Sequence, residues 1–254
     1  GLDRKILLRS DGTSVYITQD LGTADMRYDD YKMDGMAYVV ADEQNYHFKV
    51  LFALLKMLDK PFVEHLFHLS YGMVDLPDGK MKSREGNVVD ADDLIDEVKA
   101  QARSGMKERG NLEALSEEEK EEIVDKVAMA ALKYFIVKVN PQKRMTFNPS
   151  ESVDMQGQTG PYIQYSHVRI NGLLNRAKEK DLDWLNNRGS CAINQHERNL
   201  LIELSIFPDL IQQASDTYDP SLIANYCYQL AKLYHKFWTE VPIFKSEDQL
   251  LIFR

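Results

Sequence analysis

The sequence predicts an α/β domain followed by an all-α domain. Two observations carry this prediction: strand-like and helix-like patterns alternate from residue 1 to about residue 98, and only helix-like patterns follow the glycine-rich loop at 157–161. Strands that alternate with helices pair in parallel through right-handed crossovers, so the first part is expected to form a doubly wound sheet. At 254 residues and 44% hydrophobic, the chain is long enough for two domains with real cores.

The first part, residues 1–98, is expected to contain, in order, a strand, a helix, a strand, a helix and a strand. Val15 and Ile17 alternate with polar neighbours, which is typical of a half-buried strand. Asp42 is the expected N-cap of the second helix. The predicted elements are strands over 14–18, 36–41 and 65–71, a helix over 21–33, and a helix from Asp42 to about residue 58.

Residues 99–156 are expected to form a helical connection between the two domains. The stretch from 99 to about 120 is charged and poor in apolar side chains, which predicts a partly mobile segment. Ser116 and Glu119 have the spacing of a capping box, and the helix that they begin should stop before Asn140. Further helices are predicted over 161–180, 194–215 and 220–239 and from 246, within a final domain that spans 157–254.

The charge balance and the cysteines limit the function classes. A net charge of −9, from 31 basic and 40 acidic residues, argues against sequence-blind coating of nucleic acid but allows a structured RNA held along a local basic stripe. Cys191 and Cys227 lack partner-like spacing, so neither a disulfide framework nor a zinc site is expected, and a reducing cytosol fits. No apolar run reaches the length of a bilayer, so no membrane partner is expected.

A basic loop over 79–87 is the most informative segment of the sequence. It places Lys80, Lys82 and Arg84 just after the third predicted strand. A basic loop at the exit of a strand can neutralise a departing polyphosphate and then release it. Taken alone, however, these charges are better interpreted as an ordinary solvated turn.

The surroundings of this loop favour the functional interpretation. Residues 78–87, preceded by 71–74 and followed by 88–95, resemble the signature loop of class I aminoacyl-tRNA synthetases in its arginyl variant. In the usual pattern a serine follows the methionine, whereas here Lys82 precedes Ser83. The resemblance implies that the loop stabilises pyrophosphate. Its catalytic candidates, which are not ranked, are Lys80, Lys82, Ser83 and Arg84.

Three polar residues are predicted to meet at the carboxyl edge of the sheet, where doubly wound folds bind ligands. Tyr16 and Asp20 flank a predicted strand-to-helix transition, and Gln44 lies at the equivalent turn after the next strand. A carboxylate can accept the charged fork of a guanidinium while a phenol fixes its plane. The alternatives are that Asp20 only caps a helix and that Gln44 is an ordinary surface residue.

The segments around these residues extend the resemblance. Residues 10–24 and 38–47 are similar to the core of arginyl-tRNA synthetases. In that family the positions matching Tyr16, Asp20 and Gln44 contact the arginine side chain. The resemblance therefore implies that these three residues bind arginine in this chain as well.

The same resemblance implies an ATP site. The position matching His47 lies near ATP in the family, and the segment matching Gly72 and Met73 lies against adenine. A glycine there lets a flat ring approach the backbone, although a plain strand-ending glycine is the alternative. Met81 of the signature loop is assigned to ATP binding with them. Neither of the common glycine-rich phosphate fingerprints is present, which suits class I synthetases.

Aromatic and basic residues share one face of the helix that is predicted to follow the glycine-rich loop. Tyr162, Tyr165 and Arg169 are spaced by three and four residues, and Tyr234 and Trp238 repeat a spacing of four on a later helix. Rings stack on unpaired bases and arginine binds phosphate, so the face suits RNA, although spacing alone favours a core stripe with a snorkelling arginine. The region resembles the anticodon-binding domain of arginyl-tRNA synthetases, which implies that the four aromatic residues lie around the anticodon loop.

The resemblance covers essentially the whole chain. It implies the C-terminal half of a Rossmann-like class I nucleotide-binding fold, followed by a helical-bundle anticodon-binding domain that is truncated at its C-terminal end. The implied reaction joins L-arginine and ATP into arginyl-adenylate, with Mg²⁺ on the triphosphate, and then charges tRNA(Arg). A cytoplasmic monomer is expected.

The other class I signature, a His-x-Gly-His segment, does not occur in the sequence. We therefore expect this chain to be a piece of a longer protein that cannot form the adenylate alone. Two alternatives remain open. One is another class I synthetase, such as the cysteinyl type, although Asp20 and the lack of zinc-ligand cysteines speak against it. The other is a non-catalytic tRNA-binding module, which would have no reason to keep an arginine site and the basic loop together.

Overall fold

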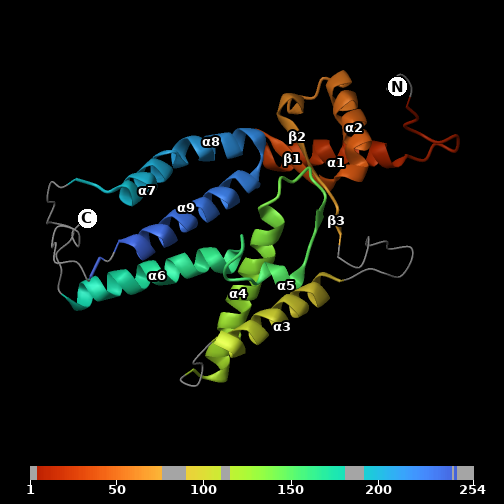
Figure 1. Cartoon of the computed structure of the whole chain (residues 1–254). Coiled ribbons are helices and arrows are strands. Elements are labelled where there is room, and N and C mark those ends of the chain that lie inside the picture. The colour runs from red at the N-terminus through yellow and green to blue at the C-terminus, as the bar shows by residue number, and fades with distance from the viewer. Residues whose placement is uncertain (1–4, 76–89, 110–114, 181–191, 242, 245–254) are drawn as a thin grey trace. The chain divides into compact units, whose positions relative to one another are not determined.

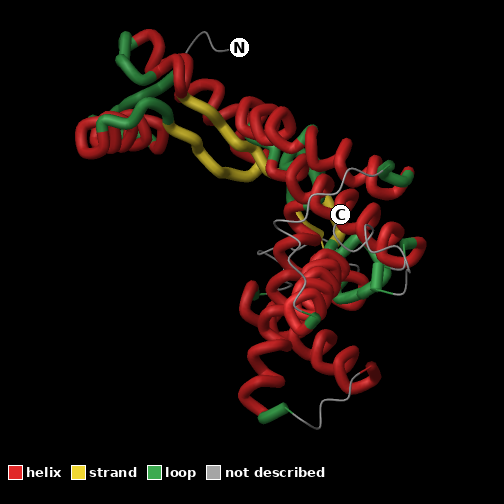
Figure 2. The backbone as a smooth tube through the Cα atoms, turned by 90° about the vertical axis from the view of Figure 1, so that its left-hand side faces the viewer, coloured by secondary structure: helices red, strands yellow, loops and turns green. Residues whose placement is uncertain are grey.

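The computed structural model describes residues 5–75, 90–109, 115–180, 192–241 and 243–244 (Figure 1). The chain divides into two compact units, a first unit of residues 1–74 with 141–145 and a second unit of residues 75–140 with 146–254. Most of the described chain is helical, and the strands are short (Figure 2). Within the described ranges, none of the helices has the length and apolarity needed to cross a membrane.

A parallel β-α-β motif forms the centre of the first unit. Strands β1 (Met36–Ala41) and β2 (Leu66–Tyr71) pair in parallel, from Met36 opposite Leu66 to Ala41 opposite Tyr71. The parallel pairing predicted for these strands is confirmed, so their carboxyl ends lie at the same edge. The segments that join them are the turn η1 (Asp42–Gln44), helix α2 (Asn45–Met57) and the turn η2 (Val63–His65).

Helix α1 (Tyr16–Tyr31) begins earlier than the sequence indicated, and the strand predicted over 14–18 is wrong. Ile17, Leu21 and Ala24 all pack in the hydrophobic cluster of the first unit, and their spacing is that of one helix face. This helical period includes Ile17 and overrides the short alternation seen in the sequence. Tyr16 and Asp20 consequently lie on the first turns of a helix.

The core of the first unit fixes α2 against the sheet. Its buried members are Ala24, Phe48, Leu51, Leu55 and Phe62. Full burial of a large apolar side chain contributes roughly 1.5–3 kcal/mol, so the three side chains from α2 hold that helix firmly. As a result, the first turn of α2 stays at the carboxyl end of β1.

The second unit is built mainly from helices. Helix α4 begins at the predicted capping box, in which the Ser116 hydroxyl accepts from the backbone N–H of Glu119 at 3.2 Å and the Glu119 carboxylate accepts from the N–H of Ser116 at 2.9 Å. The helices are α3 (Ala91–Arg109), α4 (Glu117–Val137), α5 (Pro149–Ser152), α6 (Gly160–Glu179), α7 (Gln195–Ser205), α8 (Phe207–Thr217) and α9 (Pro220–Glu240). A short strand, β3 (Val74–Asp75), also pairs with β4 (Met145–Thr146).

Helix α3 corrects the prediction of a partly mobile segment from 99 to 120, because its residues through Arg109 are helical and packed on α4. Val98 and Ala102 are one turn apart and buried. The charges that suggested a solvated segment are paired across the two helices: Arg103 donates to both carboxylate oxygens of Glu121, at 3.0 and 2.6 Å. A narrow apolar stripe flanked by ion pairs is enough to dock this helix.

The helix predicted over 194–215 is divided into α7 and α8. Pro208 lies in the first turn of α8, where a missing N–H costs nothing but where its ring would clash inside a continuous helix. The predicted helix after Asp219 is confirmed as α9, and the Asp219 carboxylate accepts from the N–H of Ser221 at 3.0 Å. The helix expected from residue 246 lies outside the described residues.

Two close contacts set the position of α6. Gly160, its first residue, lies so close to α4 that a Cβ there would collide with the carbonyl group of Ala130. Beside it, three side chains form a hydrogen-bonded ring. Lys138 Nζ donates to the carbonyl of Gln158, Gln158 Nε2 donates to Asn225 Oδ1, and Asn225 Nδ2 donates to the carbonyl of Lys138, at 3.0, 2.7 and 3.0 Å. The ring joins the end of α4 and the start of α6 to α9.

Candidate functional site

The predicted catalytic loop cannot be placed. Residues 76–89 lie outside the described residues, and with them Lys80, Met81, Lys82, Ser83 and Arg84. Their assignment to pyrophosphate and ATP therefore stays a prediction. The other predicted residues fall into two groups, one in each unit.

The first group forms where α1 approaches the start of α2. Nε2 of His47 lies 2.6 Å from Oδ2 of Asp20, and both side chains are partly buried. The Tyr16 ring stands edge-on to the His47 ring, with centroids 5.6 Å apart, and is 67% exposed. We call Tyr16, Asp20 and His47 the Asp20 cluster. It brings a predicted ATP residue into contact with two predicted arginine residues.

The Asp20 cluster still offers acceptors to a ligand. Oδ1 of Asp20 makes no hydrogen bond with a described residue, so one carboxylate oxygen and the phenol of Tyr16 are available. Gln44 is exposed at the end of η1, three residues before His47, and its amide likewise has no hydrogen-bond partner among the described residues. Gln44 thus lies in the predicted turn, and among the described residues no hydrogen bond joins it to the cluster.

Sequence reasoning missed two charged residues at the same sheet edge. Asp42 was expected only as a helix cap; instead it begins η1, and its Oδ1 is buried without a partner in the described residues. Nε of Arg144 lies 3.8 Å from Oδ2 of Asp42. The position of Asp42 directly after β1 was the available signal, whereas nothing in the sequence placed Arg144 beside it.

A glycine is needed at position 72 for a structural reason that the sequence did not reveal. Its N–H donates to the carbonyl of Pro141 at 2.7 Å, and a Cβ at this position would lie 2.5 Å from the carbonyl carbon of Lys143. Met73 continues the contact, because its carbonyl accepts from the N–H of Met145 at 3.2 Å. The glycine is therefore required by a crossing chain segment, and the adenine contact of Gly72 and Met73 stays a prediction.

The second group forms between α6 and α9, where all five predicted RNA-binding residues come together. The guanidinium of Arg169 lies over the Tyr165 ring at 4.5 Å and over the Trp238 ring at 5.7 Å from their centroids. Tyr234 and Trp238 have ring centroids 6.2 Å apart. Tyr165 is 40% exposed, whereas the hydroxyl of Tyr234 is buried. The face thus combines exposed rings with rings that belong partly to the core.

His235 joins these residues and was missed in the sequence. One ring nitrogen, Nδ1, lies 2.8 Å from NH1 of Arg169, and the other, Nε2, lies 2.8 Å from Oγ of Ser166. Its ring stacks on Tyr165 at 5.6 Å with an interplanar angle of 22°. We call Tyr162, Tyr165, Ser166, Arg169, His235 and Trp238 the His235 cluster. The only available signal was that His235 follows Tyr234.

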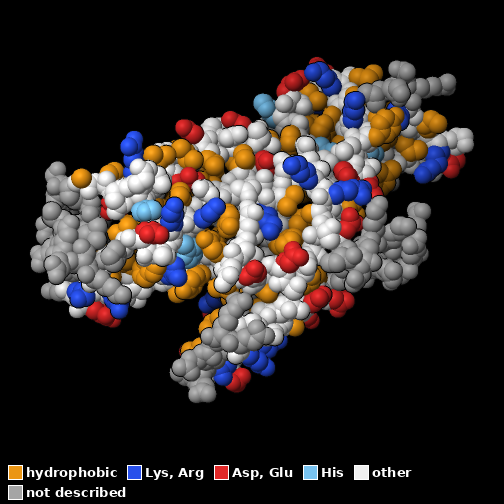
Figure 3. Space-filling model, in the orientation of Figure 1, with side chains coloured by type: hydrophobic (Ala, Val, Ile, Leu, Met, Phe, Trp, Pro, Cys, Tyr) orange, Lys and Arg blue, Asp and Glu red, His pale blue; other side chains and the backbone are white. Residues whose placement is uncertain are grey.

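The cluster holds one permanent charge, that of Arg169. Burial lowers the pKa of His235, and the neighbouring Arg169 lowers it further, so the imidazole is neutral near pH 7. Burial raises the pKa of Tyr162 and of Tyr234, which keeps both phenols protonated. The face therefore presents rings, hydroxyls and a single cation. On the face drawn in Figure 3, acidic and basic side chains of the described residues are interspersed, so a local cluster matters more than the overall charge.

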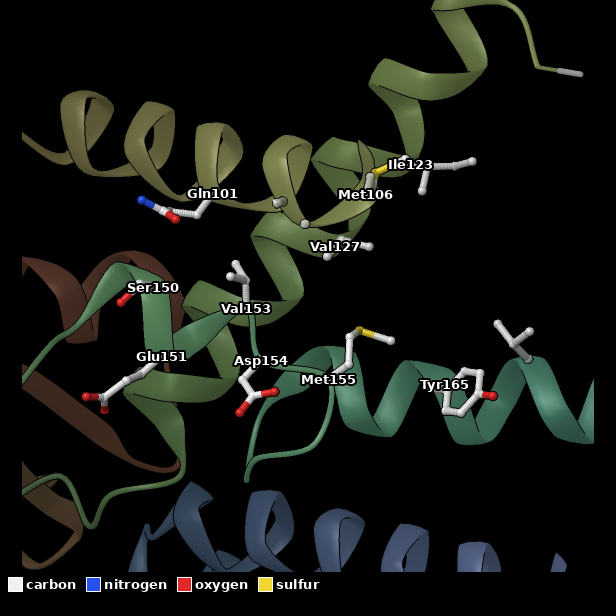
Figure 4. A pocket seen from close by; sticks show the side chains of 13 residues that line it. Gln101, Met106, Ile123, Val127, Ser150, Glu151, Val153, Asp154, Met155 and Tyr165 are labelled. Carbon is white, nitrogen blue, oxygen red and sulfur yellow. The ribbon is translucent and has the colours of Figure 1, made fainter. Parts of the chain in front are cut away.

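A cavity of about 820 Å³ adjoins Tyr165 in the second unit. Its wall comes from α3, α4, α5 with the segment that follows it, and the N-terminal half of α6, and Figure 4 shows Val127, Val153 and Met155 around it. The wall is mainly apolar, with Glu151 and Asp154 on one side. The cavity contains no predicted site residue besides Tyr165.

The chain is similar to known proteins along its whole length. Residues 2–148 match the family described as tRNA synthetases class I (R), catalytic domain, and residues 163–254 match the DALR anticodon binding domain. An arginine–tRNA ligase of Amoebophilus asiaticus is 46% identical over 250 residues, and one of Parabacteroides distasonis is 49% identical over 249. Each alignment covers 98% of this chain and 42% of the relative.

A solved structure supports the fold. Arginyl-tRNA synthetase of Thermus thermophilus superposes with a TM-score of 0.85 at 23% identity, over 100% of this chain and 47% of that one. The chain thus spans less than half the length of the proteins that it matches. Since the catalytic-domain family covers more than half of its residues, the chain belongs to the class I (R) tRNA synthetases.

Proposed function

We propose that this chain supplies the arginine-recognition residues and the tRNA-binding face of an arginine–tRNA ligase. The observation that carries the proposal is the Asp20 cluster, in which a phenol, a carboxylate and an imidazole meet beside the carboxyl edge of a parallel sheet. The names of the 46–49% identical relatives point to the same activity.

The Asp20 cluster suits the arginine side chain in charge and shape. A guanidinium is planar and permanently charged, and it prefers a carboxylate that accepts from its fork of N–H donors. Asp20 has a carboxylate oxygen available, and Tyr16 offers an exposed ring and hydroxyl beside it. His47 fixes the other carboxylate oxygen, which restricts the direction from which a ligand can approach.

The reaction needs ATP as a second substrate. The carboxylate of arginine attacks the α-phosphorus, the bond to the β-phosphate breaks and pyrophosphate leaves; a ribose hydroxyl at the end of the tRNA then displaces AMP. This scheme uses positioning and charge stabilisation and no nucleophilic side chain. Mg²⁺ would accompany the triphosphate and neutralise its charge, since this ion needs few protein ligands when phosphates supply the rest.

The His235 cluster suits the tRNA. Stacking of an unpaired base on an aromatic ring contributes about 1–3 kcal/mol, and an arginine in the same group can bind the adjacent phosphate. Tyr162, Tyr165, Arg169, Tyr234 and Trp238 are the residues that we propose for this contact, in tRNA(Arg). We further propose that the protein acts as a monomer in the cytoplasm.

A second candidate function is a tRNA-binding module without catalysis. The observation in its favour is that the His235 cluster lies wholly in the second unit and uses no residue of the first. The two candidates differ in their need for arginine, because a binding module would not select this amino acid.

A charging experiment tests the proposal. The complete polypeptide that the gene encodes is supplied with ATP, unfractionated tRNA and each amino acid in turn, and acylation is followed. We expect charging with arginine alone. Charging with another amino acid would refute the assignment of the Asp20 cluster, and binding of tRNA without any charging would favour the second candidate.

A further inference from the structure

We infer that His235 is a positioning residue for tRNA binding, which holds the guanidinium of Arg169 in place as a neutral hydrogen-bond acceptor. The inference rests on the proposed function in one respect, that the face between α6 and α9 contacts RNA. The only signal for His235 in the sequence was its position directly after Tyr234.

The direction of the hydrogen bonds fixes the state of the imidazole. A guanidinium only donates, so Nδ1 of His235, at 2.8 Å from NH1 of Arg169, must accept and carries no proton. The proton then resides on Nε2, which donates to Oγ of Ser166 at 2.8 Å. The Ser166 hydroxyl can in turn donate to the carbonyl of Tyr162, at 3.5 Å. The bonds therefore run in one direction from Arg169 to the backbone of α6.

Arg169 is held from several sides. Besides its bond to His235, it donates from NH2 to the hydroxyl of Tyr165 at 3.2 Å, and it lies over the rings of Tyr165 and Trp238. These contacts occupy one hydrogen of each terminal nitrogen, which leaves the other N–H donors for an incoming phosphate or base. An arginine that is ordered before binding loses less side-chain entropy when RNA arrives, so His235 should increase the affinity.

Protonation of His235 would break this arrangement. The charged group that faces it among the described residues is Arg169, and the titratable neighbours are Tyr162 and Tyr165 on α6 and Tyr234 on α9. A proton on Nδ1 would oppose the N–H of Arg169 and set two cations side by side. The geometry thus makes the orientation of Arg169 depend on a neutral imidazole. Because burial and Arg169 lower the pKa of His235 from the ordinary value of 6.5, the affinity for RNA should fall only when the pH drops below that value.

Two substitutions separate the contributions of His235. His235→Phe keeps a ring for stacking but removes the acceptor, and we expect it to weaken tRNA binding roughly tenfold at pH 7.5, the loss of one bond to a charged group. His235→Asn keeps an acceptor near the Nδ1 position that does not titrate, so it should bind nearly as well as the wild type and lose the decline at low pH. Each variant is compared at fixed salt by fluorescence anisotropy with labelled tRNA.

Arg169→Ala separates failure of this inference from failure of the proposed function. If Arg169→Ala binds tRNA as tightly as the wild type, the face does not contact RNA and the proposed tRNA site is wrong. If Arg169→Ala binds weakly but His235→Phe binds normally between pH 5.5 and 7.5, the role of His235 is refuted. Nitrogen NMR of the imidazole gives a readout independent of RNA: we expect protonation on Nε2, and protonation on Nδ1 would also refute the inference.

Discussion

The Asp20 cluster and the His235 cluster are assembled in different ways. The first joins its members by one hydrogen bond and one edge-on ring contact, and it leaves a carboxylate oxygen and a phenol available. The second uses both nitrogens of an imidazole to join α9 to α6, and the guanidinium that the imidazole contacts also donates to Tyr165 within α6. An open set of acceptors suits a small cation that completes the site. A set of rings already held in place suits an extended partner.

The sharpest test of the first cluster is Asp20→Ala. Removal of the partner of a buried, hydrogen-bonded guanidinium costs about 2–5 kcal/mol, so we expect the KM for arginine in tRNA charging to rise at least thirtyfold. Asp25→Ala is a matched control on the same helix, because Asp25 pairs with Lys60 at 2.6 Å and lies outside the cluster. Equal effects of the two substitutions would show that Asp20 has only a structural role.

The next largest effect is expected from the close approach of α6 to α4. Gly160→Ala places a methyl group against the carbonyl of Ala130, and overpacking of this kind costs about 1–3 kcal/mol of the free energy of unfolding. Gly172→Ala on the same helix meets no atom within 4 Å and should instead stabilise by about 0.5–1 kcal/mol. Urea unfolding of both variants measures the difference, and a stabilising Gly160→Ala would contradict the packing described here.

Substitutions of Tyr165 test whether the second cluster binds tRNA by stacking on its aromatic rings. Tyr165→Ala removes the proposed stacking surface, and we expect tRNA affinity to fall roughly tenfold, or about 1.4 kcal/mol. Tyr165→Phe keeps the ring and loses only the hydroxyl that accepts from Arg169, so its loss should be about twofold. Binding that is lost equally in both variants would mean that the hydroxyl matters and the ring does not.

The smallest effect concerns stability at high pH. Burial raises the pKa of Tyr134 in α4 to about 12, above its ordinary value of 10.0. A raised pKa in the folded state gives stability that is present below pH 10 and is lost as the pH rises from 10 through 12, so that about 1 kcal/mol is lost by pH 11. Urea unfolding at pH 9 and pH 11 should show a smaller decline for Tyr134→Phe than for the wild type. Tyr31→Phe, which removes an exposed phenol, should follow the wild type.

The same contrast explains what the sequence could predict. The spacing of Tyr162, Tyr165 and Arg169 is local, so one helix face was correctly inferred from residue numbers alone. The register of α9 against α6 is not local, and it is this register that brings His235 between them. The sequence therefore identified the aromatic residues and the arginine of the second cluster but missed Ser166 and His235, the residue that connects them.

In the first unit the local prediction failed, whereas the expected residues still come together. Asp20 and Tyr16 were placed beside a strand that does not exist, yet they meet His47 because the buried face of α1 aligns that helix with α2. Gly72 was predicted to contact adenine. The structure adds a packing reason for this glycine, because the backbone of Lys143 crosses close to it, and no local sequence pattern indicates that crossing. Helix α3 was underestimated because ion pairs with α4 replace much of the apolar surface that the sequence lacked.

The hydrogen-bonded ring of Lys138, Gln158 and Asn225 has a consequence for how α9 can move. Sliding α9 by one helical turn along α6, about 5.4 Å, would break both bonds that Asn225 makes in the ring. The ring therefore acts as a stop against longitudinal slippage. Because Asn225 and His235 belong to the same rigid helix, the alignment of the imidazole with Arg169 is maintained by an amide that lies almost three turns away.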